Sequence, residues 1–207
     1  MAQIWIPGAF GVAIRCKDGV VLGNDTRSTY GYTVNNKNVA KIFPLTKDGR
    51  VAMTCYGLIG DFQALARIMQ AQANIYEMRE GFKISVQAMG KMVANYLYQR
   101  KMAPLYVMIV IAGVEENGDG HVYTLDAGGS LTEDDYGMAG DSMYFASGML
   151  EAEYKPTLTV KKGVELMKKL LKNGMTRDAM VGSGMDVMTI TKDGTSSERF
   201  SLDELGE

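Results

Sequence analysis

The sequence of 207 residues has little histidine, little cysteine and no excess of basic charge. Its single histidine rules out a metal site with two histidine ligands and leaves almost no room for a His-dependent catalytic triad. Two cysteines cannot build a disulfide framework, so we expect a reducing compartment, the cytoplasm. The 22 Lys and Arg stand against 24 Asp and Glu, so the basic excess of a nucleic-acid-binding protein is missing.

Long apolar runs are also missing. No run approaches the ~18 residues of a membrane-spanning helix, and the longest, 105–113, has the length of a strand. Residues 1–8 contain no basic region and are too short for a signal peptide. We therefore expect neither a membrane nor a nucleic acid among the partners.

Methionine, by contrast, is abundant, with 16 Met against 6 Phe. The apolar share of 46% and the charged share of 22% are ordinary for a globular domain. Methionine adapts to irregular contacts in cores and interfaces. The methionine-rich segments 89–92 and 143–149 are therefore candidate packing surfaces between subunits.

Turn signals and apolar spacing predict the order of the elements. Asp-Gly pairs at 18–19, 48–49 and 193–194 lie between apolar runs, a pattern typical of hairpins. The first joins strands at 10–16 and 20–25, with Phe10, Val12, Ile14 and Cys16 on one face, and the second joins 40–43 to 51–55. Helical spacing predicts two helix pairs, and further strands are expected between and after them. The helices are expected around 62–76, 86–97, 144–154 and 160–171, the last ending at Gly174, and the further strands at 105–111, 121–126, 186–190 and 198–200.

Each helix pair thus lies between groups of strands rather than between single parallel strands. This order argues against a doubly wound parallel sheet. It predicts an α+β fold, a four-layer αββα sandwich of two antiparallel sheets with a helix pair on each outer face.

Few residues carry obvious chemistry when each is considered alone. We expect His121 to be a solvent-side strand residue, and Cys16 and Cys55 to be small core residues. Residues 57–61 end a strand and open a helix, with Asp61 as the expected N-cap; glycines there could expose N–H groups to an oxyanion, although a simple turn is the plainer reading. A lysine held among apolar groups near a carboxylate can activate a nucleophile, but Asp25 and Lys41 could equally form a partly exposed salt pair.

Taken together, ten short segments in the same order resemble the β-type subunit of the proteasome core particle, of the archaeal kind. The segments are Cys16-Lys-Asp-Gly-Val-Val-Leu22, Asp25-Thr-Arg27, Asn38-Val-Ala-Lys-Ile42, Val51-Ala-Met-Thr54, Gly57-Leu-Ile-Gly-Asp61, Gln63-Ala-Leu-Ala-Arg67, Tyr123-Thr-Leu-Asp126, Gly128-Gly-Ser-Leu131, Gly148-Met-Leu-Glu151 and Arg177-Asp178. The fold of that family is the N-terminal-nucleophile hydrolase sandwich, which agrees with the predicted layers. The resemblance implies the β type, because the helical extension that precedes the first strand in α-type subunits is not expected here.

The resemblance implies a threonine-type endopeptidase site without metal or cofactor. In the family, self-cleavage after a glycine unmasks an N-terminal threonine, whose own amine serves as the base. By resemblance, Asp25 orients Lys41, which tunes the site, and the backbone N–H of Gly57 binds the oxyanion. Asp178 supports the nucleophile, and the backbone of Thr29 pairs with the substrate strand.

The nucleophile position itself departs from the family pattern. The threonine is expected after Gly8, but Ala9 stands there, and alanine has no hydroxyl to cleave the Gly8–Ala9 bond or to attack a substrate. Three further departures are Asp141 and Val181, where serines are expected, and Tyr56, where a small residue precedes the oxyanion glycine. Together they favour a naturally non-catalytic subunit. The alternative is a catalytic subunit that carries an engineered Thr-to-Ala change at residue 9.

The resemblance also implies the organisation and the partners. Residues 1–8 are expected to remain as an uncleaved pre-segment, residues 9–203 to form the β-type domain and residues 204–207 a tail. Expected partners are a threonine-bearing β-type sister, α-type rings, an ATPase ring that acts through the α rings, and unfolded polypeptide substrates. A stand-alone relative of the bacterial two-ring peptidase is a weaker reading, because the subunits of that peptidase are shorter and open with a different motif.

Overall fold

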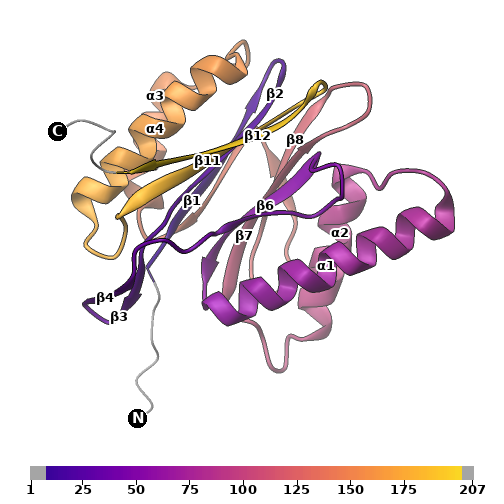
Figure 1. Cartoon of the computed structure of the whole chain (residues 1–207), viewed down its shortest axis with the longest axis horizontal. Helices are drawn as coiled ribbons and strands as arrows, with labels where there is room; N and C mark the ends of the chain where they lie inside the picture. The colour runs from indigo at the N-terminus through magenta and orange to yellow at the C-terminus, as the bar shows by residue number, and fades with distance from the viewer. Residues whose placement is uncertain (1–7, 202–207) are drawn as a thin grey trace.

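Two five-stranded antiparallel sheets face each other in the computed structural model, which describes residues 8–201 (Figure 1). The first sheet has the order β10 (Tyr136–Gly140), β1 (Phe10–Cys16), β2 (Gly19–Asp25), β11 (Gly184–Thr191) and β12 (Gly194–Ser201). The second has the order β5 (Ile42–Pro44), β6 (Val51–Gly57), β7 (Val107–Val114), β8 (Gly120–Leu125) and β9 (Thr132–Asp134). A separate hairpin consists of β3 (Ser28–Tyr30) and β4 (Thr33–Asn36).

A pair of helices covers the outer face of each sheet, which confirms the predicted four-layer sandwich (Figure 1). Helices α1 (Ile59–Glu80) and α2 (Val86–Gln99) pack on the second sheet. Helices α3 (Met143–Glu153) and α4 (Val160–Arg177) pack on the first. Gly81 ends α1 in the left-handed conformation with φ of 78°, as its place between the two apolar patterns predicts.

Because the inner strands of both sheets are covered on both faces, they bury alternate residues in different layers. In β1, Phe10, Val12 and Ile14 contact the α3–α4 side, as their shared face predicts, while Ala13 points between the sheets. The layer between the sheets is a separate apolar cluster that includes Leu22 and Val110. Cys16 and Cys55 are buried core residues, as expected. His121 lies in β8 with its side chain 30% exposed and its Nδ1 2.6 Å from Oε1 of Glu133, as expected of a solvent-side residue.

Two expectations about boundaries are wrong. Gly174 does not end its helix: α4 continues to Arg177, and Gly174 is buried inside it. A Cβ at this position would lie 3.0 Å from the ring of Phe10 and 3.1 Å from Cβ of Ser142, so the glycine permits close packing rather than a helix stop. The expected strand at 198–200 is longer, since β12 begins at Gly194.

The expected pre-segment, apart from Gly8, and the expected tail at 204–207 lie outside the described residues. Within residues 8–201, no helix has the length and apolar character needed to cross a membrane.

Candidate functional site

The predicted site residues come from distant segments and meet at one end of the sandwich. Ala9 immediately precedes β1, Asp25 is the last residue of β2, and Gly57 is the last of β6. Lys41 lies directly before β5, and Asp178 caps the end of α4. This is the end of the sheets at which β1 begins and β2 and β6 finish, while the Asp-Gly turns lie at the other end.

Asp25 is the centre of this cluster, and its side chain is fully buried. Its Oδ1 accepts hydrogen bonds from the Lys41 ammonium at 2.7 Å and from the Phe10 backbone N–H at 3.0 Å. Its Oδ2 accepts from the backbone N–H groups of Arg27 at 3.0 Å and Gly182 at 3.1 Å. The sequence left open a partly exposed salt pair, but the Lys41 side chain is only 2% exposed. A buried carboxylate needs such hydrogen bonds, and the four donors hold the segments that carry them in place around Asp25.

Ala9 lies beside this carboxylate and is 2% exposed. Its carbonyl oxygen accepts a hydrogen bond from the backbone N–H of Asp141 at 3.2 Å. That approach requires Gly140, which has φ of 113° and whose added Cβ would lie 2.0 Å from the Ala9 oxygen. Gly8 is equally confined, since a Cβ there would lie 2.1 Å from Cβ of Met180. The predicted processing junction is therefore enclosed on both sides by protein.

Asp178 has a partner that the sequence did not reveal. The hydroxyl of Ser142 donates to its Oδ2 at 3.0 Å, and the Met180 backbone N–H donates to its Oδ1 at 2.8 Å. Ser142 is fully buried and precedes α3. The only available signal was its place next to Asp141, the position at which a serine was expected. Ser142, one residue after the position at which a serine was expected, thus makes the contact with Asp178.

Two of the departures from the family pattern contact each other. The Tyr56 hydroxyl lies 3.3 Å from Oδ1 of Asp141, to which it donates. Burial, and next the charge of Asp178, raise the pKa of Asp141 above its ordinary range, against the opposing effect of the Tyr56 hydrogen bond. Burial, and next the charge of Asp141, raise the pKa of Tyr56. Val181, the third departure, belongs to the apolar core on the α3–α4 side and is fully buried.

Gly57 adopts a φ of 127°, and a Cβ there would lie 1.9 Å from the Tyr106 carbonyl oxygen. Only glycine fits this strand end, and its role as an oxyanion donor stays a prediction. The expected N-cap Asp61 is wrong, because Leu58 occupies that position without a side-chain cap. Asp61 lies in the first turn of α1, where its Oδ2 accepts a hydrogen bond from the Tyr106 backbone N–H at 2.8 Å.

A cleft of about 300 Å³ lies between the β3–β4 hairpin and the start of α1. Thr29 lines it, and its Oγ1 lies 3.9 Å from Sδ of Met180. The lining residues are Ser28, Thr29, Tyr30, Asn35, Leu58, Ile59, Gly60 and Asp61. The role of Thr29 in pairing with a substrate strand stays a prediction.

Arg27 ties the loop after α4 to this cluster, a contact that no sequence pattern indicated. Its Nε donates to Oγ of Ser183 at 3.2 Å, and its Nη1 donates to the carbonyl of Ala179 at 2.9 Å. Ser183 has a φ of 69°, which is uncommon for a residue other than glycine. The loop that carries Asp178 and Gly182 is therefore held from the β2 side.

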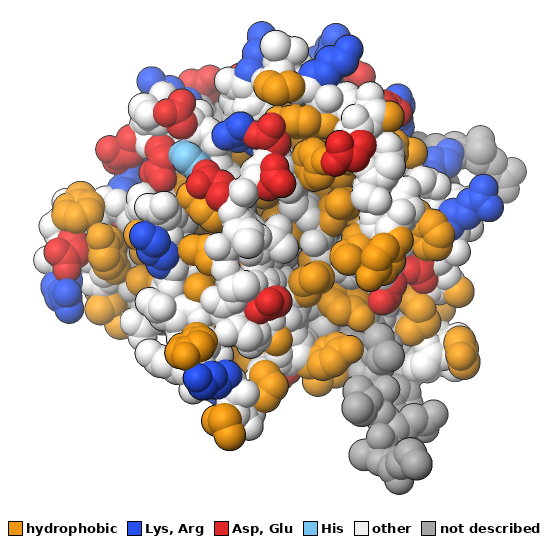
Figure 2. All heavy atoms as spheres, turned by 180° about the vertical axis from the view of Figure 1, so that it is seen from behind, with side chains coloured by type: hydrophobic (Ala, Val, Ile, Leu, Met, Phe, Trp, Pro, Cys, Tyr) orange, Lys and Arg blue, Asp and Glu red, His pale blue; other side chains and the backbone are white. Residues whose placement is uncertain are grey.

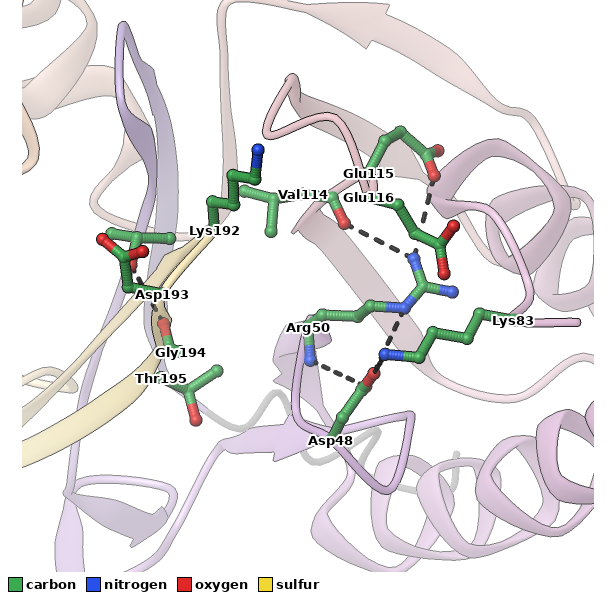
Figure 3. A pocket seen from close by; sticks show the side chains of 11 residues that line it. Asp48, Arg50, Lys83, Val114, Glu115, Glu116, Lys192, Asp193, Gly194 and Thr195 are labelled. Atoms are coloured by element: carbon green, nitrogen blue, oxygen red, sulfur yellow. Dashed lines mark hydrogen bonds and ion pairs between the residues drawn. The ribbon is translucent and has the colours of Figure 1, made fainter.

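A second cavity of about 370 Å³ lies at the other end of the sandwich, where the Asp-Gly turns gather (Figure 3). Asp48 stands between two cations there, with Lys83 Nζ at 2.7 Å and Arg50 Nε at 3.4 Å. Arg50 Nη1 is also 3.7 Å from a carboxylate oxygen of Glu115. These charges neutralise one another, and the cavity contains none of the predicted site residues.

Across residues 8–201, no three His, Cys, Asp or Glu side chains gather in a way that would hold a metal ion. The cluster around Asp25 is instead a set of backbone N–H donors, one lysine, carboxylates and hydroxyls. These groups donate and accept hydrogen bonds.

Comparisons with known proteins point to a single family. A family model described as "Proteasome subunit" matches residues 8–190. The chain is 35% identical over 200 residues to "Proteasome subunit beta 2" of Thermofilum pendens, covering 97% of this chain and 96% of that one. It is 38% identical over 192 residues to "Proteasome subunit beta" of Methanosphaerula palustris, covering 92% and 90%. It is 36% identical over 194 residues to "Proteasome subunit beta 2" of Pyrococcus furiosus, covering 94% and 92%.

Proposed function

The chain belongs to the proteasome subunit family as a β-type subunit of the core particle, and we propose that it is a non-catalytic one. The observation that carries the proposal is Ala9, which stands beside the buried Asp25–Lys41 pair with a methyl group in place of a hydroxyl. A carbon with no lone pair cannot attack a carbonyl, so neither self-cleavage after Gly8 nor substrate hydrolysis can start at this residue.

Ser142, Thr29 and Cys16 are not suited to replace the nucleophile. Ser142 is fully buried, with its hydroxyl donated to Asp178, and Oγ1 of Thr29 faces the sulfur of Met180. Cys16 lies at the far end of β1, and burial raises the pKa of its thiol to about 12. A thiol with so high a pKa supplies almost no thiolate.

In this proposal the subunit contributes ring geometry and chamber wall to a threonine-type endopeptidase complex in the cytoplasm. A threonine-bearing β-type sister supplies the peptidase sites, and α-type rings and an ATPase ring control the entry of unfolded polypeptides. Support comes from the family membership together with Ala9. A proteolytically active particle that contains this chain as its only β-type species would overturn the proposal.

A catalytic subunit with an engineered Thr-to-Ala change is the second candidate. One observation favours it: the Ser142–Asp178 contact is formed at the same end of the sandwich as Ala9. Tyr56 and Asp141 count against it, since they add a partly buried phenol and a carboxylate to the same end of the sandwich.

The variant Ala9→Thr separates the two candidates. If the chain is naturally non-catalytic, Ala9→Thr keeps residues 1–8 and adds no peptide hydrolysis to an assembled particle whose sister subunit is inactivated. Mass spectrometry shows whether residues 1–8 are retained, and a fluorogenic peptide measures the hydrolysis. Ala9→Val is the matched control, because valine has the shape of threonine without its hydroxyl. Loss of residues 1–8 with peptide hydrolysis in the Ala9→Thr particle would establish the catalytic candidate.

A silent Ala9→Thr variant leads to a second step that tests the cause. Asp141→Ser, Val181→Ser and Tyr56→Ala, added to Ala9→Thr, are expected to restore part of the hydrolysis if these side chains block the site.

A further inference from the structure

An asparagine that directly precedes a glycine can react with its own backbone. Glycine has no side chain to shield its nitrogen, and it adopts conformations in which this nitrogen reaches the side-chain amide of the preceding residue. Asparagine is accordingly one of the thermolabile residues of proteins. The sequence contains this pair twice, at Asn117–Gly118 and at Asn173–Gly174. The structure places the two pairs in opposite surroundings.

Asn117 and Gly118 lie in the turn between β7 and β8, which continues from the glutamates on the rim of the cavity in Figure 3. The Asn117 side chain is exposed, and Gly118 has a φ of 97°. The Gly118 N–H donates to the carbonyl of Glu115 at 2.9 Å. A short exposed turn opens locally at little cost in free energy, and opening frees the Gly118 nitrogen.

Asp119 prepares the amide of Asn117 for attack by this nitrogen. The Asp119 backbone N–H donates to Oδ1 of Asn117 at 3.0 Å. A donor at this oxygen stabilises the negative charge that develops there when the amide carbon is attacked. On the other side of the amide, Nδ2 of Asn117 donates to Oδ2 of Asp119 at 2.6 Å. A carboxylate beside the leaving nitrogen is placed to pass on the proton that the attacking nitrogen loses.

Asn173 and Gly174 lie inside α4, where the backbone is held on two counts. The helix fixes the peptide group between them through its hydrogen-bond ladder. Gly174 is also buried, and a Cβ added there would lie 3.0 Å from the ring of Phe10. Attack by the Gly174 nitrogen on the Asn173 amide therefore requires the end of α4 to unfold.

We propose that Asn117 is a site of self-modification, at which the folded chain converts its own side-chain amide into a carboxylate. The Gly118 nitrogen bonds to Cγ of Asn117 and loses its proton, the bond from Cγ to Nδ2 breaks, and ammonia leaves with that proton. The product is a five-membered succinimide ring. Water adds to one of its two carbonyl carbons, and the bond from that carbon to the ring nitrogen breaks. The outcome is aspartate or isoaspartate at residue 117, with one water consumed and one ammonia released.

The new carboxylate weakens the turn. It replaces the hydrogen bond from Asn117 to Asp119 with a contact between two negative groups, close in sequence to Glu115 and Glu116. The chain already has a net charge of −2, and Figure 2 shows acidic side chains close together on the face opposite to Figure 1. The isoaspartate form also lengthens the main chain by one carbon. The modified fraction therefore rises with the age of the chain, whether or not the subunit is catalytic.

Mass spectrometry of the full-length chain, kept folded for several days in mildly alkaline buffer, tests this site. After digestion with a glutamate-specific protease, the peptide with residue 117 is expected to gain one mass unit and the peptide with residue 173 none. Digestion in heavy-oxygen water gives a larger gain to any amide lost during the digest, which separates that background. In urea both peptides are expected to change. If neither changes in the folded chain while both change in urea, or if both change alike in the folded chain, the proposal is overturned.

Two variants test the chemistry. Asn117→Gln is expected to abolish the gain, because glutamine would have to close a six-membered ring; a gain that persists would overturn the assignment to Asn117. Asp119→Ala keeps the backbone N–H but removes the carboxylate, and is expected to slow the reaction by at least about threefold. Asp193→Ala, at the exposed turn between β11 and β12, is the matched control and leaves the rate unchanged. An unchanged or faster rate in Asp119→Ala would overturn the part assigned to Asp119.

Discussion

Replacing Lys41 by methionine isolates the contribution of the buried ion pair. Lys41 and Asp25 are 2% and 0% exposed, and their charged atoms are 2.7 Å apart. Methionine keeps most of the length of the side chain but removes the charge. The Lys41→Met variant therefore leaves Asp25 buried with three backbone N–H donors and no countercharge.

The expected cost follows from those remaining contacts. Removing one partner of a buried ion pair typically costs about 3–5 kcal/mol. The three N–H donors still stabilise the carboxylate, so we expect the lower end, about 3 kcal/mol. For a chain of this length that corresponds to a fall in Tm of roughly 6–12 °C.

Urea unfolding of the full-length chain measures this difference, with thermal unfolding as a second reading. Lys47→Met, at an exposed turn position, is the matched control and should change the free energy of unfolding by less than about 0.5 kcal/mol. If Lys41→Met lowers the free energy of unfolding by less than about 1 kcal/mol, the reasoning is refuted. The double variant Lys41→Met/Asp25→Asn should lose less than the two single variants added together, because neither charge is then left alone.

Gly57→Ala is expected to lower the free energy of unfolding by at least ~2 kcal/mol in the same urea assay, since its Cβ would meet the Tyr106 carbonyl. Gly60→Ala is the control and should not lower it, because nothing lies within 4 Å of a Cβ added there. Because its raised folded pKa makes ionised Asp141 destabilising, Asp141→Asn should be more stable than the parent chain at about pH 7. That advantage should disappear below about pH 4 in thermal unfolding scans. Cys16, with its pKa raised to about 12, should react with maleimide only after unfolding, as mass spectrometry can show.

The parts of the fold that the sequence predicts are those with a strong local pattern. The Asp48–Gly49 turn lies between β5 and β6, and the regularly spaced apolar residues of α1 and α2 pack on the second sheet. The hairpin β3–β4 and the strands β9 and β10 were not predicted. They are three to five residues long, and β4 and β9 are wholly exposed, so apolar alternation is either missing or too short to detect.

Tertiary contacts explain the remaining differences. A glycine just after an apolar helical pattern is typical of a helix stop, but Gly174 lies inside α4 and lets this helix approach Phe10. That contact is tertiary, so no local pattern encodes it. Ser142 and Asp141 are adjacent, and only the turn before α3 decides which of them reaches Asp178. The buried Asp25–Lys41 pair joins residues 16 positions apart. Residue chemistry alone left open whether they form a partly exposed salt pair, and only the family resemblance implied their roles in the site.

The contacts of Asp25 explain how the site can keep its shape without a nucleophile. Its four donors come from the start of β1, the turn after β2, the residue before β5 and the loop before β11. None of these donors is a side chain of residue 9, because the contact with β1 uses the Phe10 backbone N–H. Loss of a hydroxyl at residue 9 therefore removes none of the bonds that hold this end of the sandwich. An intact Asp25–Lys41 pair is thus expected in active and inactive subunits alike, and only the Ala9→Thr reversion distinguishes them.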